Sequence, residues 1–163
     1  LFGVRQSWPA LGGVYKLGAI QDKKGEWQYR IKLSEQAIKI SNPGILQVRR
    51  YYDEKGQFMG DAMYNEVASK FLSNKIVDND KQIHTIKNYD KYSDLLKPIF
   101  EAGALIYKSP NIHQIREYVF EQFSEFENYI NQKGNIVLGL EYHLFELKQM
   151  LINSKRKNSE KKL

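Results

Sequence analysis

Apolar and polar residues alternate along much of the first 64 residues, a pattern that predicts β-strands with one buried face. Strands are expected over residues 14–20, 27–33, 46–52 and 57–63. Turns separate them at 22–25, 42–44 and 53–56, where Gly is joined by Asp or by Asn-Pro. These turns predict two hairpins joined in one antiparallel sheet. The buried face of the second strand would carry Trp27, Tyr29, Ile31 and Leu33.

The apolar spacing becomes helical after residue 109. Ser109 and Pro110 predict a helix start, because Ser caps free N–H groups and Pro is tolerated at the first helical position. One apolar stripe follows, made of Ile112, Ile115, Val119, Phe123, Phe126 and Ile130. Gly134 is expected to end the connection to a second helix, whose apolar face is Leu140, Leu144, Leu147 and Leu151. The two helices are predicted to pair as an antiparallel hairpin.

The stretch between residues 65 and 109 has a weaker pattern. A helical turn or two is expected at 67–72, a polar loop at 78–90 and a short strand near 104–107. Taken together, the expected strands and helices predict an α+β fold, with an antiparallel β-meander followed by a C-terminal helical region. We divide the chain into strands at 1–64, an α+β cap with a helical hairpin at 65–152, and a disordered basic tail at 153–163.

Charge and composition narrow the function classes. The net charge of +6 invites a nucleic-acid interpretation, but residues 155–163 hold five Lys or Arg against one Glu, so the remainder carries only +2 (6 − 4). The absence of Cys excludes disulfides and thiolate metal sites and is typical of a cytoplasmic protein. No apolar run is long enough for a membrane span, and no export signal opens the chain. The first residues, Leu-Phe-Gly-Val, suggest a fragment or a processed product.

Few residue constellations carry chemistry. The Gly12-Gly13 pair predicts a tight entry into a strand, because no helix with Lys and Ser or Thr follows it. Arg49 and Arg50 are either phosphate ligands or residues of a strand surface with an inter-domain ion pair, and the second is commoner. The three histidines, His84, His113 and His143, lie far apart, so no metal site is expected. No catalytic residue is predicted.

Several blocks of the chain resemble one enzyme family. Pro9-Ala10-Leu11-Gly12-Gly13-Val14-Tyr15-Lys16-Leu17 is followed by Ile31-Lys32-Leu33-Ser34-Glu35 and by Asn42-Pro43-Gly44 through Val48-Arg49-Arg50. In this order they resemble the segment that follows the catalytic barrel in nicotinate phosphoribosyltransferases. Further matches to the family's C-terminal helical region are residues 96–103, 106–110 and 144–148.

The resemblance implies a part of a larger enzyme. That enzyme would join nicotinate to phosphoribosyl pyrophosphate with ATP hydrolysis and Mg²⁺, form nicotinate mononucleotide for NAD synthesis, and work as a cytoplasmic homodimer. An α/β barrel would precede this segment, and no cofactor is expected to bind the segment alone. The resemblance also makes Arg30, Lys32 and Ser34 either a border of the active-site cleft or, as we favour, the solvent side of a strand.

Phe2-Gly3-Val4 is similar to the start of the family's phosphate loop, which implies that the backbone of Gly3 helps to bind phosphate. Arg5 and Gln6 depart from that loop's Gly and Thr, and the following linker is short. Either this loop has lost its phosphate cradle or, as we favour, residues are missing between Val4 and Trp8, which would account for both departures.

Two alternatives stay open. One is a free-standing basic sheet that binds single-stranded nucleic acid through Trp27, Tyr29, Tyr51 and Tyr52. The other is a catalytically degenerate homologue kept as a scaffold.

Overall fold

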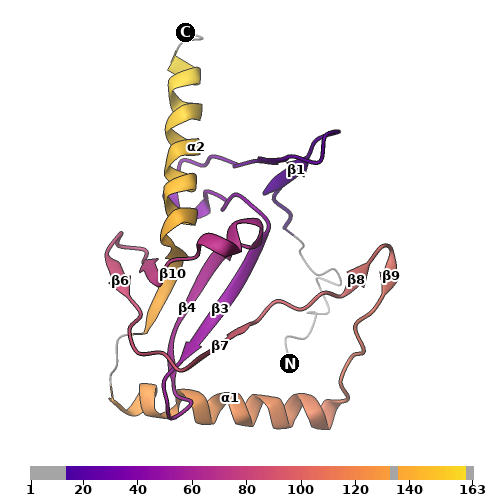
Figure 1. Cartoon of the computed structure of the whole chain (residues 1–163), viewed down its shortest axis with the longest axis vertical. Helices are drawn as coiled ribbons and strands as arrows, with labels where there is room; N and C mark the ends of the chain where they lie inside the picture. Colours follow the sequence, from indigo (N-terminus) through magenta and orange to yellow (C-terminus); the bar gives the residue numbers. More distant parts are fainter. Residues whose placement is uncertain (1–13, 133–135, 161–163) are drawn as a thin grey trace, which may run out of the picture.

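A six-stranded mixed sheet forms the centre of the molecule. The computed structural model describes residues 14–132 and 136–160, apart from the side chains of 69–71, 127–132 and 158–160. The strand order is β6-β5-β10-β4-β3-β7, and β10 runs parallel to β4 while every other neighbouring pair is antiparallel. The bounds are β3 (Leu46–Tyr52), β4 (Phe58–Asn65), β5 (Lys75–Val77), β6 (Ile83–Thr85), β7 (Lys91–Asp94) and β10 (Val137–Glu141). Figure 1 shows the long β3–β4 pair at the middle of this sheet.

The β3–β4 hairpin confirms the prediction for residues 46–63. Its turn forms because the Asp53 carboxylate accepts hydrogen bonds from the backbone N–H of Lys55 and Gln57, at 2.9 and 2.8 Å. Gly56 supplies the positive φ of 74° that the turn requires. All of these signals are local in sequence, so the pattern located the hairpin.

The first predicted hairpin exists but does not join this sheet. β1 (Ala19–Gln21) and β2 (Trp27–Tyr29) form a separate two-stranded sheet, shorter than predicted. Beyond β2 the main chain bonds elsewhere: Arg30 N–H and Gly44 N–H both donate to the Gly18 carbonyl, and Lys32 N–H donates to Ser41 Oγ. The buried face predicted for residues 27–33 is wrong, because Trp27 and Leu33 are 37% and 36% exposed.

Residues 66–85 contain more structure than predicted. The helical turn at 67–72 is confirmed as the 3₁₀ helix η2 (Glu66–Phe71), and a second one, η1 (Ala37–Lys39), lies earlier in the chain. The prediction of a polar loop over residues 78–90 is wrong where β6 lies. This strand pairs with β5, and a turn at Asp78 joins the two. Strands this short take their identity from their sheet neighbours, so the sequence pattern does not indicate them.

Residues 95–111, which we call the arm, extend away from the sheet edge (Figure 1). The predicted strand near 104–107 is β9 (Ala104–Leu105), which pairs with β8 (Phe100–Glu101) at the tip. Ala102 and Gly103 form the tip turn with φ of 47° and 81°.

Helix α1 (Ile112–Gln132) begins later than Ser109 and Pro110 suggested. Asn111 is its cap: the side-chain oxygen accepts from His113 N–H and Gln114 N–H, each at 3.0 Å. The Gln114 side chain in turn accepts from Asn111 N–H at 2.9 Å, which completes a capping box. This reciprocal pair, rather than Ser109, satisfies the free N–H groups of the first turn.

The predicted helical hairpin is wrong. Leu140 belongs to β10, which lies between α1 and α2 (Tyr142–Glu160), and Figure 1 shows the two helices at opposite ends of the sheet. Helix α2 continues to Glu160, so the prediction of a disordered tail from residue 153 is wrong for the described residues of that segment. The predicted stop at Gly134 lies outside the described residues.

Buried side chains from several strands form the hydrophobic core. Its buried cluster is Tyr51, Ala62, Ile76 and Ile86, with Met59 and Val137 packed against it. Leu144 and Ile152 of α2 are also buried. The predicted α+β class is confirmed, and the two predicted regions 1–64 and 65–152 contribute strands to the same sheet.

Candidate functional site: two adjacent arginines on β3

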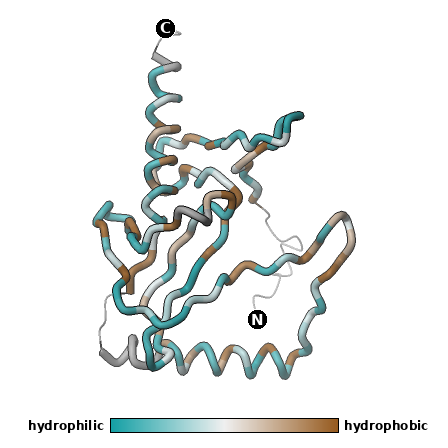
Figure 2. The backbone as a smooth tube through the Cα atoms, viewed as in Figure 1, coloured by the Kyte–Doolittle hydropathy of each residue, from teal (hydrophilic) through white to brown (hydrophobic). Residues whose placement is uncertain are grey.

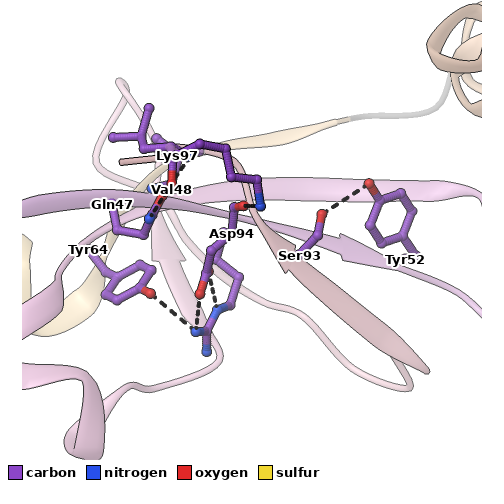
Figure 3. Close-up of polar contacts among 9 residues, drawn as sticks. Gln47, Val48, Tyr52, Tyr64, Ser93, Asp94 and Lys97 are labelled. Carbon is purple, nitrogen blue, oxygen red and sulfur yellow. Dashed lines mark hydrogen bonds and ion pairs between the residues drawn. The ribbon is translucent and has the colours of Figure 1, made fainter. Parts of the chain in front are cut away.

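Arg49 links the two strands that flank β3. Its position in the register lies opposite Asp94 of β7 and Ala62 of β4. The guanidinium Nε and one terminal N–H group each donate to a different oxygen of Asp94, both at 2.9 Å. The same terminal group donates to the Tyr64 hydroxyl at 3.2 Å (Figure 3). Arg49 therefore holds an edge strand and a central strand to β3 at one point.

Rings enclose the same guanidinium. Its central carbon lies 3.9 Å from the ring centre of Tyr92 and 4.9 Å from that of Tyr64. The side chains of Arg49 and Asp94 are 16% and 33% exposed, so solvent screens the pair only in part. Hydrogen bonding from Arg49 lowers the pKa of Asp94 below its ordinary value and outweighs the opposing effect of burial. Asp94 is therefore a firmly ionised partner, and the pair is a short bidentate one.

Arg50 makes an equivalent arrangement on the opposite face. It lies across from Asp61 of β4 in the register and binds both carboxylate oxygens at 2.9 Å. A further N–H group donates to Gln122 of α1 at 2.7 Å. The guanidinium carbon lies about equally far from the ring centres of Phe58 and Phe126, at 4.9 and 5.0 Å. Arg50 thus fastens α1 to the hairpin.

These contacts decide between the two interpretations of the arginines. Each guanidinium already forms a bidentate pair with a carboxylate, so an incoming phosphate would have to displace a matched anion. The interpretation as strand-surface ion pairs is confirmed, but its inter-domain part is wrong, because both pairs join strands of one sheet. The sequence indicated two adjacent Arg on a strand, but Asp94 lies 45 residues away and nothing local identifies it.

Glu141 is the site residue that sequence reasoning missed. Only 3% exposed, it caps α2 by accepting from His143 N–H and Leu144 N–H, at 3.0 and 3.2 Å. Its other oxygen accepts from the Ser73 hydroxyl at 2.7 Å and Ser73 N–H at 3.0 Å, and contacts His143 Nδ1 at 2.8 Å. Burial raises the pKa of Glu141, but these bonds outweigh it and lower the pKa overall. An acid directly before a helical pattern was the available signal.

Lys148 fastens the middle of α2 to the loop after η1. Its Nζ donates to Asn42 Oδ1 at 2.8 Å and to the Ile40 carbonyl at 3.3 Å. Burial, with Lys16 nearby, lowers the pKa of Lys148. Its bonding partners are neutral oxygens within the fold, so the contact is a structural one.

The remaining predicted residues give no reaction centre within the described part of the chain. Arg30 donates to the Tyr29 carbonyl and the Gln28 side chain, and Lys32 is exposed, but both lie beyond the end of β2 and are not strand residues as predicted. Tyr51 and Tyr52 are only 4% and 7% exposed, so neither is available to stack on a base. Gly3, Arg5, Gln6, Gly12 and Gly13 lie outside the described residues.

Two of the three histidines contact carboxylates of their own segments. His84 Nε2 lies 2.7 Å from Asp78, while His143 contacts Glu141. Within 14–132 and 136–160, no three His, Asp or Glu side chains form a group that could hold a metal ion. No helix within residues 14–132 and 136–160 is both long and apolar enough to cross a membrane.

A mixed six-stranded sheet with ion-paired arginines and a capped second helix defines an α+β domain. The family model of the nicotinate phosphoribosyltransferase C-terminal domain matches residues 46–135. The match covers more than half of the chain and spans β3 to α1, so the chain belongs to this family.

Two curated relatives are similar over a longer stretch. Nicotinate phosphoribosyltransferase of Bacillus subtilis (strain 168) is 34% identical over 124 residues, which is 71% of this chain and 24% of that relative. Nicotinate phosphoribosyltransferase of Dictyostelium discoideum is 31% identical over 131 residues, 74% of this chain and 21% of that relative. The chain thus spans less than a quarter of the length of each relative.

Proposed function

We propose that this chain is the C-terminal portion of a nicotinate phosphoribosyltransferase. The parent enzyme joins nicotinate to phosphoribosyl pyrophosphate, releases pyrophosphate and forms nicotinate mononucleotide for NAD biosynthesis, with ATP hydrolysis coupled to the reaction. The observation that carries the proposal is the family match over residues 46–135, which coincides with the central hairpin, the arm and α1.

The proposed role of the chain is support rather than catalysis. Departure of pyrophosphate from an anomeric carbon needs preorganised donors and cations near the leaving group, and nicotinate needs a cation for its carboxylate. The two arginines that the structure clamps, Arg49 and Arg50, are already bound to Asp94 and Asp61. We therefore assign the phosphate, nicotinate and Mg²⁺ ligands to the remainder of the enzyme, an upstream α/β barrel, and propose a cytoplasmic homodimer.

The phosphate contact proposed for Gly3 belongs to the junction with that barrel. A backbone amide at a residue without Cβ approaches an anion closely, which is the reason for assigning the contact to Gly3. A Gly3→Val variant of the complete enzyme should raise the KM for phosphoribosyl pyrophosphate. An unchanged KM would remove Gly3 from the phosphate site.

Two samples test the proposed function. The native protein, purified from its source, should have an intact mass far above 19.1 kDa and should form nicotinate mononucleotide from nicotinate, phosphoribosyl pyrophosphate, ATP and Mg²⁺. The recombinant 163-residue chain should form none under the same conditions. Turnover by the short chain would overturn the supporting role. A long native protein without turnover would instead favour the catalytically degenerate scaffold.

A further inference from the structure

The arm and the first half of α1 carry large apolar side chains that the rest of the described chain leaves open to solvent. We call this the arm–helix surface and define it by Phe100, Leu105, Ile106, Ile112, Phe120 and Phe123, which are 47–71% exposed. Figure 2 shows the apolar segments along the arm and at intervals along α1. Phe100 and Leu105 are paired across β8–β9, and Ile112 and Phe123 lie on one side of α1, so each part exposes neighbouring large apolar side chains, which mark an interaction site.

Both ends of this segment are fixed to the sheet. At the base of the arm the Leu96 N–H donates to Gln47 Oε1, with 2.9 Å between nitrogen and oxygen. The Gln47 side-chain N–H in turn donates to the Leu96 carbonyl, with 3.0 Å between nitrogen and oxygen. At the other end Phe126 packs on Phe58 with ring centres 4.6 Å apart, and Gln122 binds Arg50. The surface between these anchors is therefore held in a defined place, beyond the sheet edge in Figure 1.

The apolar stripe of α1 continues past its contact with the sheet. The stripe that meets the hairpin at Phe126 runs back through Phe123, Val119 and Ile115 to Ile112, at three- and four-residue steps. Ile112 is the most exposed of these side chains, and it lies where the arm joins the helix. The helix thus has the length and pattern to cover a second body besides the sheet.

We propose that the arm–helix surface is the docking face for the portion of the parent enzyme that this chain does not cover. The inference rests on the proposed function and deepens it. The curated relatives are about four times longer than the stretch they share with this chain, which covers 24% and 21% of them. A permanent contact within one polypeptide is rich in large apolar and aromatic residues, as this surface is. A second copy of the chain is the competing occupant.

Hydroxyl-radical footprinting tests the assignment by comparing the native protein with the recombinant 163-residue chain. Modification of Phe100, Phe120 and Phe123 should be roughly tenfold slower in the native protein, as for side chains that enter an interface core. Met150 of α2 and Ile38 of η1 are exposed controls outside the surface and should change little. Equal rates for the three phenylalanines in both samples would overturn the proposal. Protection that disappears on dilution to the monomer would assign the surface to a second copy and overturn it too.

A matched pair of variants gives an independent measurement. Leu105→Glu and Phe120→Glu should lower the Tm of the native protein but leave the Tm of the short chain nearly unchanged, because both side chains are exposed there. Met150→Glu should leave both Tm values nearly unchanged. Equal Tm shifts in the two proteins would contradict the docking face. Mononucleotide synthesis, assayed on the same native sample, reports separately on the proposed function.

Discussion

Arg49 and Arg50 are neighbours in β3, so their side chains leave opposite faces of the sheet and reach different strands. Arg49 crosses to Asp94 on the edge strand, and Arg50 crosses to Asp61 on the other side. Cross-strand pairs of opposite charge stabilise a given register, since a shift of one residue would break both pairs at once. The two arginines therefore specify how β7, β3 and β4 align.

Replacement of Arg49 with Met should destabilise the chain by about 1–3 kcal/mol, because it leaves the Asp94 carboxylate without its partner in a half-buried position. Urea denaturation at pH 7 measures the free energy of unfolding. Lys87→Met, at an exposed position, is the control and should have little effect. A loss no greater than that of the control would show that the pair contributes nothing to stability.

Glu141 makes the stability of α2 depend on pH. Its folded pKa is lowered from the ordinary value of 4.5, so its contribution is complete above that value and is lost as the pH falls through the lower folded pKa. Glu141→Gln should cost about 1–2 kcal/mol at pH 7, because an amide accepts fewer of the five hydrogen bonds. The difference from the parent chain should shrink below pH 4.5.

Urea midpoints at pH 7, 5, 4 and 3, roughly bracketing the ordinary pKa, follow this difference. Glu54→Gln changes an exposed turn carboxylate and should show no such convergence. A difference that stays constant down to pH 3 would contradict the assignment of the pH dependence to Glu141.

At the scale of the elements, the approach of β10 to its neighbours depends on glycine. A Cβ on Gly139 would collide with the Val77 carbonyl of β5, and one on Gly60 of β4 would lie 2.6 Å from the Val137 carbonyl. The parallel contact of β10 with β4 aligns Val137 with Gly60 and Gly139 with Ala62. The small residues therefore let β10 fit between β4 and β5.

Gly139→Ala should lower the free energy of unfolding by about 3 kcal/mol or more, because a methyl group has no room against backbone atoms. Leu138→Ala changes the exposed neighbour in the same strand and should cost under about 1 kcal/mol. Far-ultraviolet circular dichroism and urea denaturation compare the two. Equal stabilities would show that β10 is not as tightly held as its contacts indicate.

The elements that the sequence located are those with local signals. The β3–β4 hairpin has period-two alternation and an Asp-Gly turn between its strands, and both ends were predicted within two residues. In contrast, β10 has five residues and was assigned to a helix through Leu140, because Leu140 and Leu144 also satisfy a four-residue step. Its neighbours β4 and β5 make it a strand, and they are distant in sequence.

The residues of the candidate site show the same contrast between local signals and partners that are distant in sequence. Adjacent arginines on a predicted strand were visible, and their interpretation as ion pairs on a strand surface was right, although the pairs lie within one sheet and not between domains. Asp94, Gln122 and Ser73 come from other elements, 45, 72 and 68 residues away from their partners. Only the fold brings these three residues to Arg49, Arg50 and Glu141. The sequence alone therefore does not identify the partners of the charged residues.

At the scale of the whole molecule, the distribution of charge argues against specific nucleic-acid binding. Of the net charge of +6, residues 156–163 supply +3, from four Lys or Arg and one Glu. The aromatic residues proposed for base stacking do not form one exposed surface. Tyr51 and Tyr52 are core residues, while Trp27 lies on the separate β1–β2 hairpin. A basic end without a stacking platform binds polyanions only by charge.

The isolated chain should therefore bind single-stranded RNA weakly, with a Kd no tighter than about 10⁻⁶ M at physiological salt. Deletion of residues 156–163 removes four cations, so the slope of log K against log salt should fall by up to about 3. Trp27→Ala should leave affinity and slope unchanged, because the interaction needs no stacked base. Fluorescence anisotropy between roughly 50 and 200 mM salt measures both quantities. A tenfold loss of affinity in Trp27→Ala, with the slope retained after the deletion, would instead identify β1–β2 as an RNA-binding surface, because removal of one stacked base costs about that much.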